Sequence, residues 1–189
     1  MPVTYTNRRG KLFYLHQGTT RAGNPQYYFA LKAEGNLVAE LPAGYEIEET
    51  PNAQVFLRRR RPLLITAEER ATVADGVRAL AQTRYTLVDV KGKVISVYVA
   101  DQNTDHLLAV LTRFSGEERA RSAMEKELTY SPRLRFVLTD HERRLFICER
   151  SYFLGSVDDF GALTGPEPLE KLVQTYAPHL GNHSFYELY

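Results

Sequence analysis

The stretch RYTLVDVKGKVISVYVA, residues 84–100, decides the fold. It is rich in Val, Ile and Tyr on both sides of Lys91-Gly92, a pattern typical of two strands joined by a tight turn. With Lys91 and Gly92 as the turn, Val88 faces Ile95 and Thr86 faces Val97. The predicted hairpin therefore has one consistently apolar face, which other parts of the chain must cover.

A second hairpin is predicted farther along the chain, from the runs 133–139 and 144–150. Both runs contain β-branched and aromatic residues at alternate positions. The predicted pairing places Leu138 opposite Leu145, with a second apolar pair formed by Phe136 and Ile147. This hairpin also needs a cover for its apolar face.

Helix signals lie on both sides of the hairpins. Thr66 with Glu69 forms a capping box, followed by apolar residues at helical spacing to about residue 82. Ser115 with Glu118 forms a second capping box ahead of another predicted helix. A further helix is predicted between Pro166 and Pro178. The apolar run 106–111 fits either a helix or a strand, and a helix is favoured because Thr104 or Asp105 could cap it.

The two capping boxes also suggest an internal repeat. An offset of 49 residues aligns 66–71 with 115–120 and superposes the two hairpins. Two interpretations stay open: a doubled α-β-β unit, or a chance match between common acidic capping boxes. If the repeat is real, both hairpins should join one antiparallel sheet with both helices on one face.

The first third of the chain is predicted to be β-rich. Strands are expected at 11–17 and 26–32, joined by an eight-residue loop rich in turn-forming residues, and a third strand at 53–60 runs into four arginines. The predicted fold class is α+β. A small antiparallel β-rich module, residues 1–61, precedes an α+β module of antiparallel hairpins with helices on one face, residues 62–189.

The boundary between the modules is placed at Arg61-Pro62, where two signals coincide. Proline disfavours helix before it and removes a ladder donor. Residues 1–61 carry nine Lys and Arg against five Glu, whereas the remainder carries 15 against 18 acidic residues. The net charge therefore changes sign at this point.

Composition limits the classes of protein. A chain of 189 residues with 43% hydrophobic content can bury a core. It contains no apolar run approaching the roughly 18 residues of a membrane helix, and its polar N-terminus does not resemble a signal peptide. The single cysteine, Cys148, excludes an intramolecular disulfide, which suits a reducing compartment. We expect a cytoplasmic protein with no membrane partner.

Motifs of the large enzyme classes are missing from the sequence. It has no P-loop, glycine-rich dinucleotide turn, Gly-x-Ser-x-Gly elbow or paired-cysteine metal motif. Cys148 lies in a strand pattern and is expected to be an apolar core residue rather than a nucleophile. His179, His183 and Glu187 have helical spacing, but Gly181 interrupts it. No catalytic residue, metal ligand or cofactor is predicted.

The first module combines basic and aromatic residues. Nucleic-acid-binding proteins use this mixture because cations neutralise phosphates while aromatic rings stack on bases. The alternative is that the tyrosines stiffen a small sheet and the arginines keep an edge strand soluble. The predicted contacts to nucleic acid are Arg8, Arg9, Arg21, Tyr27, Tyr28, Arg58 and Arg60.

Both ends of the chain resemble a family of uncharacterised bacterial proteins, through the hairpin 11–29 and the segments 153–156, 179–181 and 184–188. The resemblance implies no activity. From the residues, the expected function is a non-catalytic binding or regulatory protein that contacts nucleic acid through the basic N-terminal β module. The alternatives are an enzyme of hydrolase or nuclease type and a protein–protein interaction module. An enzyme should gather acidic and histidine side chains in one pocket, whereas a binding protein should present a basic groove.

Overall fold

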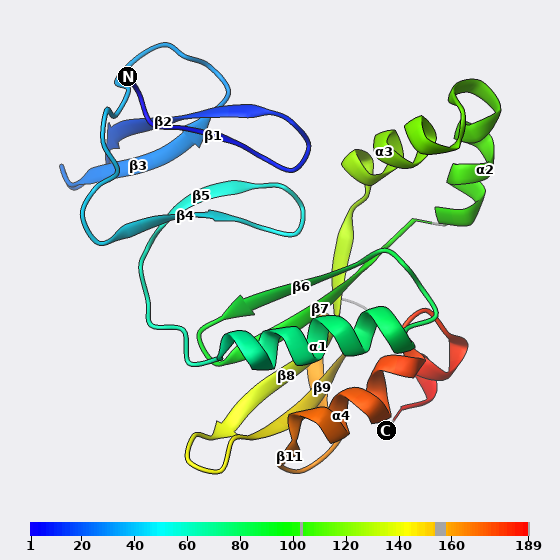
Figure 1. Ribbon diagram of the computed structural model, residues 1–189. Coiled ribbons are helices and arrows are strands. Elements are labelled where there is room, and N and C mark those ends of the chain that lie inside the picture. Colours follow the sequence, from blue (N-terminus) through cyan, green and yellow to red (C-terminus); the bar gives the residue numbers. More distant parts are fainter. Residues whose placement is uncertain (103, 154–157, 189) are drawn as a thin grey trace. The chain divides into compact units, whose positions relative to one another are not determined.

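The computed structural model describes residues 1–102, 104–153 and 158–188 and shows an α+β protein (Figure 1). Within this part of the chain no helix is both long and apolar enough to cross a membrane. The helices are α1 Ala67–Leu80, α2 Thr104–Ser115, α3 Glu117–Glu127 and α4 Leu169–Tyr176, with 3-10 turns η1 Ala177–His179 and η2 His183–Glu187. The strands are β1 Thr4–Thr6, β2 Leu12–Thr19, β3 Pro25–Ala30, β4 Tyr45–Glu49, β5 Val55–Arg59, β6 Thr86–Lys91, β7 Val94–Ala100, β8 Tyr130–Asp140, β9 Leu145–Phe153, β10 Asp158–Ala162 and β11 Glu167–Pro168.

The chain forms two compact units. The first contains residues 1–61 and also the helical segment 105–128, and the second contains residues 62–104 and 129–189. The sequence pattern had grouped the helical segment with the second module. Whether residues 62–189 fold by themselves stays a prediction.

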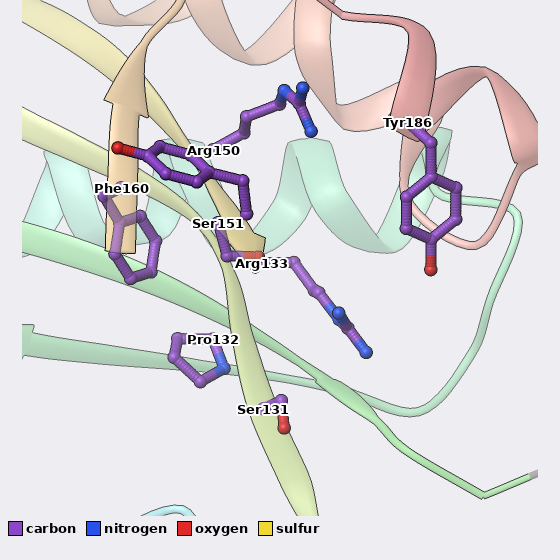
Figure 2. A pocket seen from close by; sticks show the side chains of 8 residues that line it. Ser131, Pro132, Arg133, Arg150, Ser151, Phe160 and Tyr186 are labelled. Atoms are coloured by element: carbon purple, nitrogen blue, oxygen red, sulfur yellow. The ribbon is translucent and has the colours of Figure 1, made fainter. Parts of the chain in front are cut away.

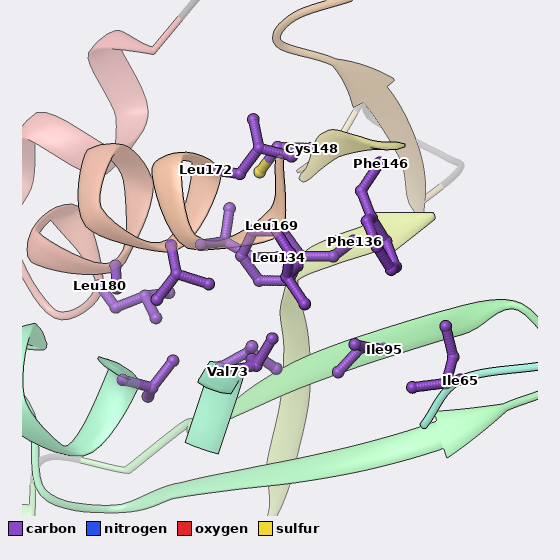
Figure 3. Close-up of a cluster of buried hydrophobic side chains, with 14 of the residues drawn as sticks. Ile65, Val73, Ile95, Leu134, Phe136, Phe146, Cys148, Leu169, Leu172 and Leu180 are labelled. Atoms are coloured by element: carbon purple, nitrogen blue, oxygen red, sulfur yellow. The ribbon is translucent and has the colours of Figure 1, made fainter. Parts of the chain in front are cut away.

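The second unit is built on an antiparallel sheet with the order β10-β9-β8-β7-β6, and β11 pairs with the free stretch of β9. Helices α1 and α4 lie against one face of this sheet (Figure 1). Val73 and Val77 of α1 belong to one buried cluster with Leu172 and Val173 of α4 and with strand residues. Figure 3 labels Val73 and Leu172 within this cluster. The strand side of this core consists of Ile95, Val97, Val99, Leu134, Phe136, Leu138, Phe146 and Cys148.

The first hairpin of this sheet has a different register from the predicted one. Its loop is Gly92-Lys93, so Val88 lies opposite Val97 and Thr86 opposite Val99. Gly92 has φ +57, which suits the first loop position of a two-residue hairpin. The shift is two residues along the partner strand. The same side chains therefore still face the core, because the side-chain period of a strand is two.

The second hairpin differs by one residue, which has a larger consequence. Phe136 lies opposite Cys148 and Leu138 opposite Phe146, so the predicted pairing of Phe136 with Ile147 is wrong. The register shifts between Leu138 and Asp140, and Arg144 in the turn has φ +52. This irregular turn places Phe146 and Cys148 in the core.

The capping box at Thr66 is confirmed, and the second one is wrong. Thr66 Oγ1 accepts a hydrogen bond from Glu69 N at 3.2 Å, and Glu69 Oε2 accepts one from Thr66 N at 2.9 Å. Helix α3 begins after Gly116, which has φ +76 and no side chain with which to close a capping box. The two hairpins do join one sheet, but α3 belongs to the first unit. The helix beside α1 is α4.

Glu69 also ties α1 to the turn between β8 and β9. Arg144 Nε donates to Glu69 Oε1 at 2.8 Å, and Arg144 Nη2 donates to Glu69 Oε2 and to the carbonyl oxygen of Leu64.

We expect Glu69→Ala to lower the free energy of unfolding by about 1–2 kcal/mol, because the cap and a partly exposed bidentate pair are lost together. Glu69→Gln should cost less. Urea denaturation measures both, with Glu142→Ala, exposed in the same turn, as the control. If Glu69→Ala and Glu142→Ala lowered the free energy of unfolding equally, Glu69 would not link α1 to the β8–β9 turn.

The first unit contains the sheet β1-β2-β3 and the hairpin β4–β5. The loop between β2 and β3 has five residues instead of the predicted eight, since Thr19 already pairs with Pro25. Tyr5 of β1 donates its hydroxyl hydrogen to Glu49 Oε2 of β4 at 2.9 Å. Burial and this carboxylate raise the pKa of Tyr5, so the hydroxyl stays protonated and donating at neutral pH.

Candidate functional site

A pocket lies where β8 and β9 part. The two strands pair as far as Leu134 and Arg150. Beyond this point β8 continues along β7 through Pro132, while β9 continues along β10 through Tyr152. Proline has no N–H for a ladder and is typical of such sheet irregularities. The parting leaves a hollow of about 450 Å³.

The lining of this pocket is basic, hydroxylic and aromatic (Figure 2). Arg133 comes from β8 and Arg150 from β9, so two cations from diverging strands enter one hollow. The described lining contains no carboxylate. The remaining lining residues are Ser131, Pro132, Ser151, Tyr152, Phe160 and Tyr186.

Arg133 and Tyr186 both line the pocket, and Figure 2 shows the two side chains extending into the same region from β8 and η2. Nη2 of Arg133 is 3.5 Å from Asp101 Oδ1, a long contact between two side chains that are each about one-third exposed. Such a contact is weak in water, so Arg133 can turn to another anion. The neighbouring Phe185 is buried and packs edge-on against Tyr186, which fixes the η2 backbone.

The aromatic rings on the other side are held in place. Arg135 Cζ lies 3.5 Å from the centroid of the Phe160 ring, a cation–π contact. The Tyr152 ring lies over Gly161, where a Cβ atom would come within 2.9 Å of Tyr152 Cε1. A glycine at this position therefore gives the ring its space. Rigid rings offer a flat surface with little conformational entropy left to lose.

A second hollow of about 410 Å³ shares Arg133 and Tyr186 with the first. It extends along the end of β7 to Asp101 and to the chain around Asn182 and His183. The two hollows meet at these two shared residues and together make a groove. We name this groove, lined by the residues of both hollows, the parting groove.

The candidate nucleophile and metal ligands lie in other surroundings. Cys148 is fully buried, and burial strongly raises the pKa of its thiol, so it is an apolar core residue. His179 Nδ1 is 2.8 Å from Ser184 Oγ, and exposed His183 is 3.4 Å from Glu187. Within the described chain no three His, Cys, Asp or Glu side chains are grouped to hold a metal ion.

Four of the arginines predicted to bind nucleic acid have partners inside the first unit. Arg8 donates to the carbonyl oxygens of Glu125 and Leu128, and Arg9 donates to that of Leu128. Cations are favourable at this carboxyl end of α3.

Arg58 and Arg60 lie beside the acidic residues of β4. Nitrogens of Arg58 are 3.0 Å from Glu46 and 3.2 Å from Glu48. Arg60 is 3.9 Å from Glu46 and more exposed. These carboxylates neutralise much of the basic run that the sequence presents.

The other predicted contacts are more open. Tyr28 is 47% exposed, with its ring stacked on the buried His16 at 5.2 Å. Tyr27 packs edge-on against Tyr45 at 5.9 Å. Arg21 is exposed in the loop between β2 and β3. A half-exposed ring and an exposed cation therefore lie on the β2–β3 hairpin.

Sequence reasoning missed the parting groove. The available signals were Pro132, directly before one predicted strand, and the run Arg150-Ser151-Tyr152, which begins at the last residue of the next predicted strand. No family model matches this sequence, and no curated protein or solved structure is significantly similar to it.

Proposed function

We propose that this protein is a non-catalytic binding protein for single-stranded nucleic acid, with its main contacts in the parting groove. One observation carries the proposal: Arg133 and Arg150 enter a pocket that also holds serine hydroxyls and aromatic rings, without a carboxylate in its described lining. Arginines and hydroxyls suit phosphate oxygens. Tyr152, Phe160 and Tyr186 offer ring faces and edges to bases.

Binding is favoured over catalysis because of which groups line the groove. A hydrolase or nuclease needs a general base, a metal ion or an activated nucleophile near the phosphate. The described lining of the second hollow contains one carboxylate, that of Asp101, and one imidazole, that of His183, and the described chain groups no three side chains that could hold a metal ion. The lining therefore favours holding an anion over transferring a proton.

The first unit is assigned a smaller share of the contacts. Arg8, Arg9 and Arg58 are engaged by carbonyl or carboxylate groups, and releasing them would cost part of the energy gained from phosphate. Tyr28 and Arg21 can contribute one stacking contact and one phosphate contact.

The proposal predicts a large effect of removing both groove arginines. We expect Arg133→Ala with Arg150→Ala to weaken binding of a fluorescein-labelled twelve-nucleotide oligo-dT by about 10- to 100-fold, since each arginine contacts one phosphate. The dependence of log K on log salt should flatten by about 1.4, or 0.7 per phosphate for a single strand. Tyr152→Ala should weaken binding while leaving this slope unchanged, because stacking releases no counterion. Fluorescence anisotropy at several salt concentrations measures all three.

The matched control is Arg58→Ala with Arg60→Ala, which removes the same charge from the first unit. We expect less than a threefold change. A larger loss from this control than from the groove pair would place the phosphate contacts in the first unit. If the unmodified chain at micromolar concentration and low salt binds neither DNA nor RNA, the proposed function is wrong.

A further inference from the structure

Strand β6 is the edge of the sheet in the second unit. Ala100 N donates to the carbonyl oxygen of Tyr85 at 3.0 Å, which makes these two a hydrogen-bonded pair. In an antiparallel ladder such pairs alternate with non-hydrogen-bonded ones. The backbone N–H and C=O groups of Thr86, Val88 and Val90 therefore point away from β7, toward the open edge.

A groove of about 720 Å³ runs between this edge and α1. Arg70, Ala74 and Arg78 follow one another at helical spacing along its wall. Arg84 lies at its end, and Thr86 and Val88 form the strand side. An open strand edge next to a helix is the arrangement by which several peptide-binding domains add a peptide as an extra strand.

The positive charge of this groove favours an acidic ligand. Three arginines line it, and neither Arg70 nor Arg84 is paired with a carboxylate in the described part of the chain. Arg78 forms an exposed pair with Asp75 at 2.8 Å, a contact typically worth less than about 1 kcal/mol. We propose that β6 and α1 form a docking groove for an extended, acidic peptide segment of a partner protein, which pairs with β6 as a further strand.

The spacing of the wall residues defines a peptide pattern. Arg70 and Arg78 are eight residues apart, or about 12 Å along the helix axis. Two strand residues four apart are separated by about 13 Å and point to the same face. Ala74 lies between the arginines and leaves room for an apolar side chain. The peptide should therefore carry an acidic, an apolar and an acidic residue at alternate positions.

Strand β6 also has little protection against such pairing. Proteins shield edge strands with proline, bulges or inward-pointing charges. β6 has six residues in continuous register with β7, no proline, and Thr86, Val88 and Val90 toward the helix-covered face. This site is separate from the parting groove and does not depend on the proposed nucleic-acid binding.

The test uses the full chain and a fluorescein-labelled peptide of seven residues, with glutamate, valine and glutamate at alternate positions and threonine elsewhere. We expect micromolar binding by anisotropy. A peptide of the same sequence with N-methyl groups on the backbone nitrogens that face β6 should bind at least tenfold more weakly, because it cannot form the ladder. A peptide with lysine in place of glutamate should also bind at least tenfold more weakly. Both comparisons leave the protein unchanged.

Two variants test the protein side. Val88→Pro removes the outward N–H of an edge strand, and Arg70→Glu with Arg84→Glu reverses the charge; each should reduce peptide binding at least tenfold with an unchanged circular dichroism spectrum. Arg119→Glu, an exposed site in the first unit, is the charge control and should have no effect. Arg133→Ala with Arg150→Ala should keep full peptide binding even if nucleic-acid binding is lost or was never present.

Three results would overturn the proposal. They are equal binding of the N-methylated or lysine peptide, absence of binding at 500 μM (a concentration about 100-fold above a low-micromolar Kd), and a concentration-dependent dimer that Val88→Pro converts to monomer. The last result would make a second copy of this chain the occupant of the edge.

Discussion

Replacing Gly76 with valine is expected to lower the stability of the second unit by about 3 kcal/mol or more. Gly76 lies where α1 passes α4, and a Cβ atom added there would come within 2.2 Å of Val173 Cγ1. Overpacking of a core typically costs about 1–3 kcal/mol, and a branched side chain adds further overlap. The helices must therefore separate or Val173 must leave its rotamer.

The alanine variant decides whether packing or helix propensity dominates. Alanine is favoured over glycine inside a helix by about 1 kcal/mol. At 2.2 Å the overlap should outweigh this gain, so we expect Gly76→Ala to destabilise by about 1–2 kcal/mol. Urea denaturation measures the loss, and hydrogen exchange of the α1 amides locates it.

A double-mutant cycle supplies the control. Val173→Ala opens space at the contact, so the double variant should be more stable than the sum of the single effects predicts, by about 1–2 kcal/mol. Gly165→Ala, where an added Cβ atom has no neighbour within 4 Å among the described residues, should change stability little. If Gly76→Ala instead stabilises the protein, α1 and α4 are not in close contact at this glycine.

The main elements of the second unit could be predicted because their signals are local. Thr66 and Glu69 lie three residues apart and form the cap that they predict. The register of the strands could not be predicted in this way. Whether Phe136 faces Ile147 or Cys148 depends on a bulge and on the positive φ of Arg144, and alternation of apolar residues on both faces of β9 allows either choice.

The position of α3 in the fold is a second feature that could not be predicted from the sequence. Ala120 and Met124 of this helix and Leu128 at its end follow one another at helical spacing, and all three are buried. Such an apolar helix face predicts burial, but it does not predict which part of the fold the helix packs against. The helix belongs to the first unit, where Arg8 and Arg9 bind the carbonyl groups at its end. These arginines are more than 110 residues away in the sequence, so no local pattern links them to α3.

The candidate site likewise depends on contacts between residues that are far apart in the sequence. An arginine in a sequence is available to phosphate only if no carboxylate lies beside it in the fold. Arg58 is occupied because β4, which the sequence did not predict, brings Glu46 and Glu48 to it. Arg150 lines a pocket because β8 leaves β9 just beyond it. The residue types could therefore suggest a basic binding protein. Only the strand order shows that Arg58 is paired with carboxylates whereas Arg150 lines a pocket.

Asn7 is expected to be the most sensitive polar residue of the first unit, because it joins two turns. Its side-chain amide donates to the carbonyl oxygen of Ala53 at 2.7 Å. Its Oδ1 accepts hydrogen bonds from Arg9 N at 3.1 Å and Lys11 N at 2.9 Å. Ala53 has φ +61, a conformation that costs an alanine about 1–2 kcal/mol and needs support from its surroundings.

Asn7→Ala should lower the stability of the first unit by about 3 kcal/mol, since three backbone groups lose their partner and Asn7 is only 5% exposed. Asn7→Asp keeps both acceptor bonds but sets a carboxylate oxygen against the carbonyl of Ala53, so its effect should fall as the pH is lowered and the carboxylate is protonated. Asn36→Ala, at an exposed asparagine, is the control. Urea denaturation followed by hydrogen exchange at Arg9, Lys11 and Ala53 distinguishes the variants. If Asn7→Ala costs less than about 0.5 kcal/mol, or if exchange rises evenly over both units, the two turns are held by other contacts and Asn7 is not the clamp between them.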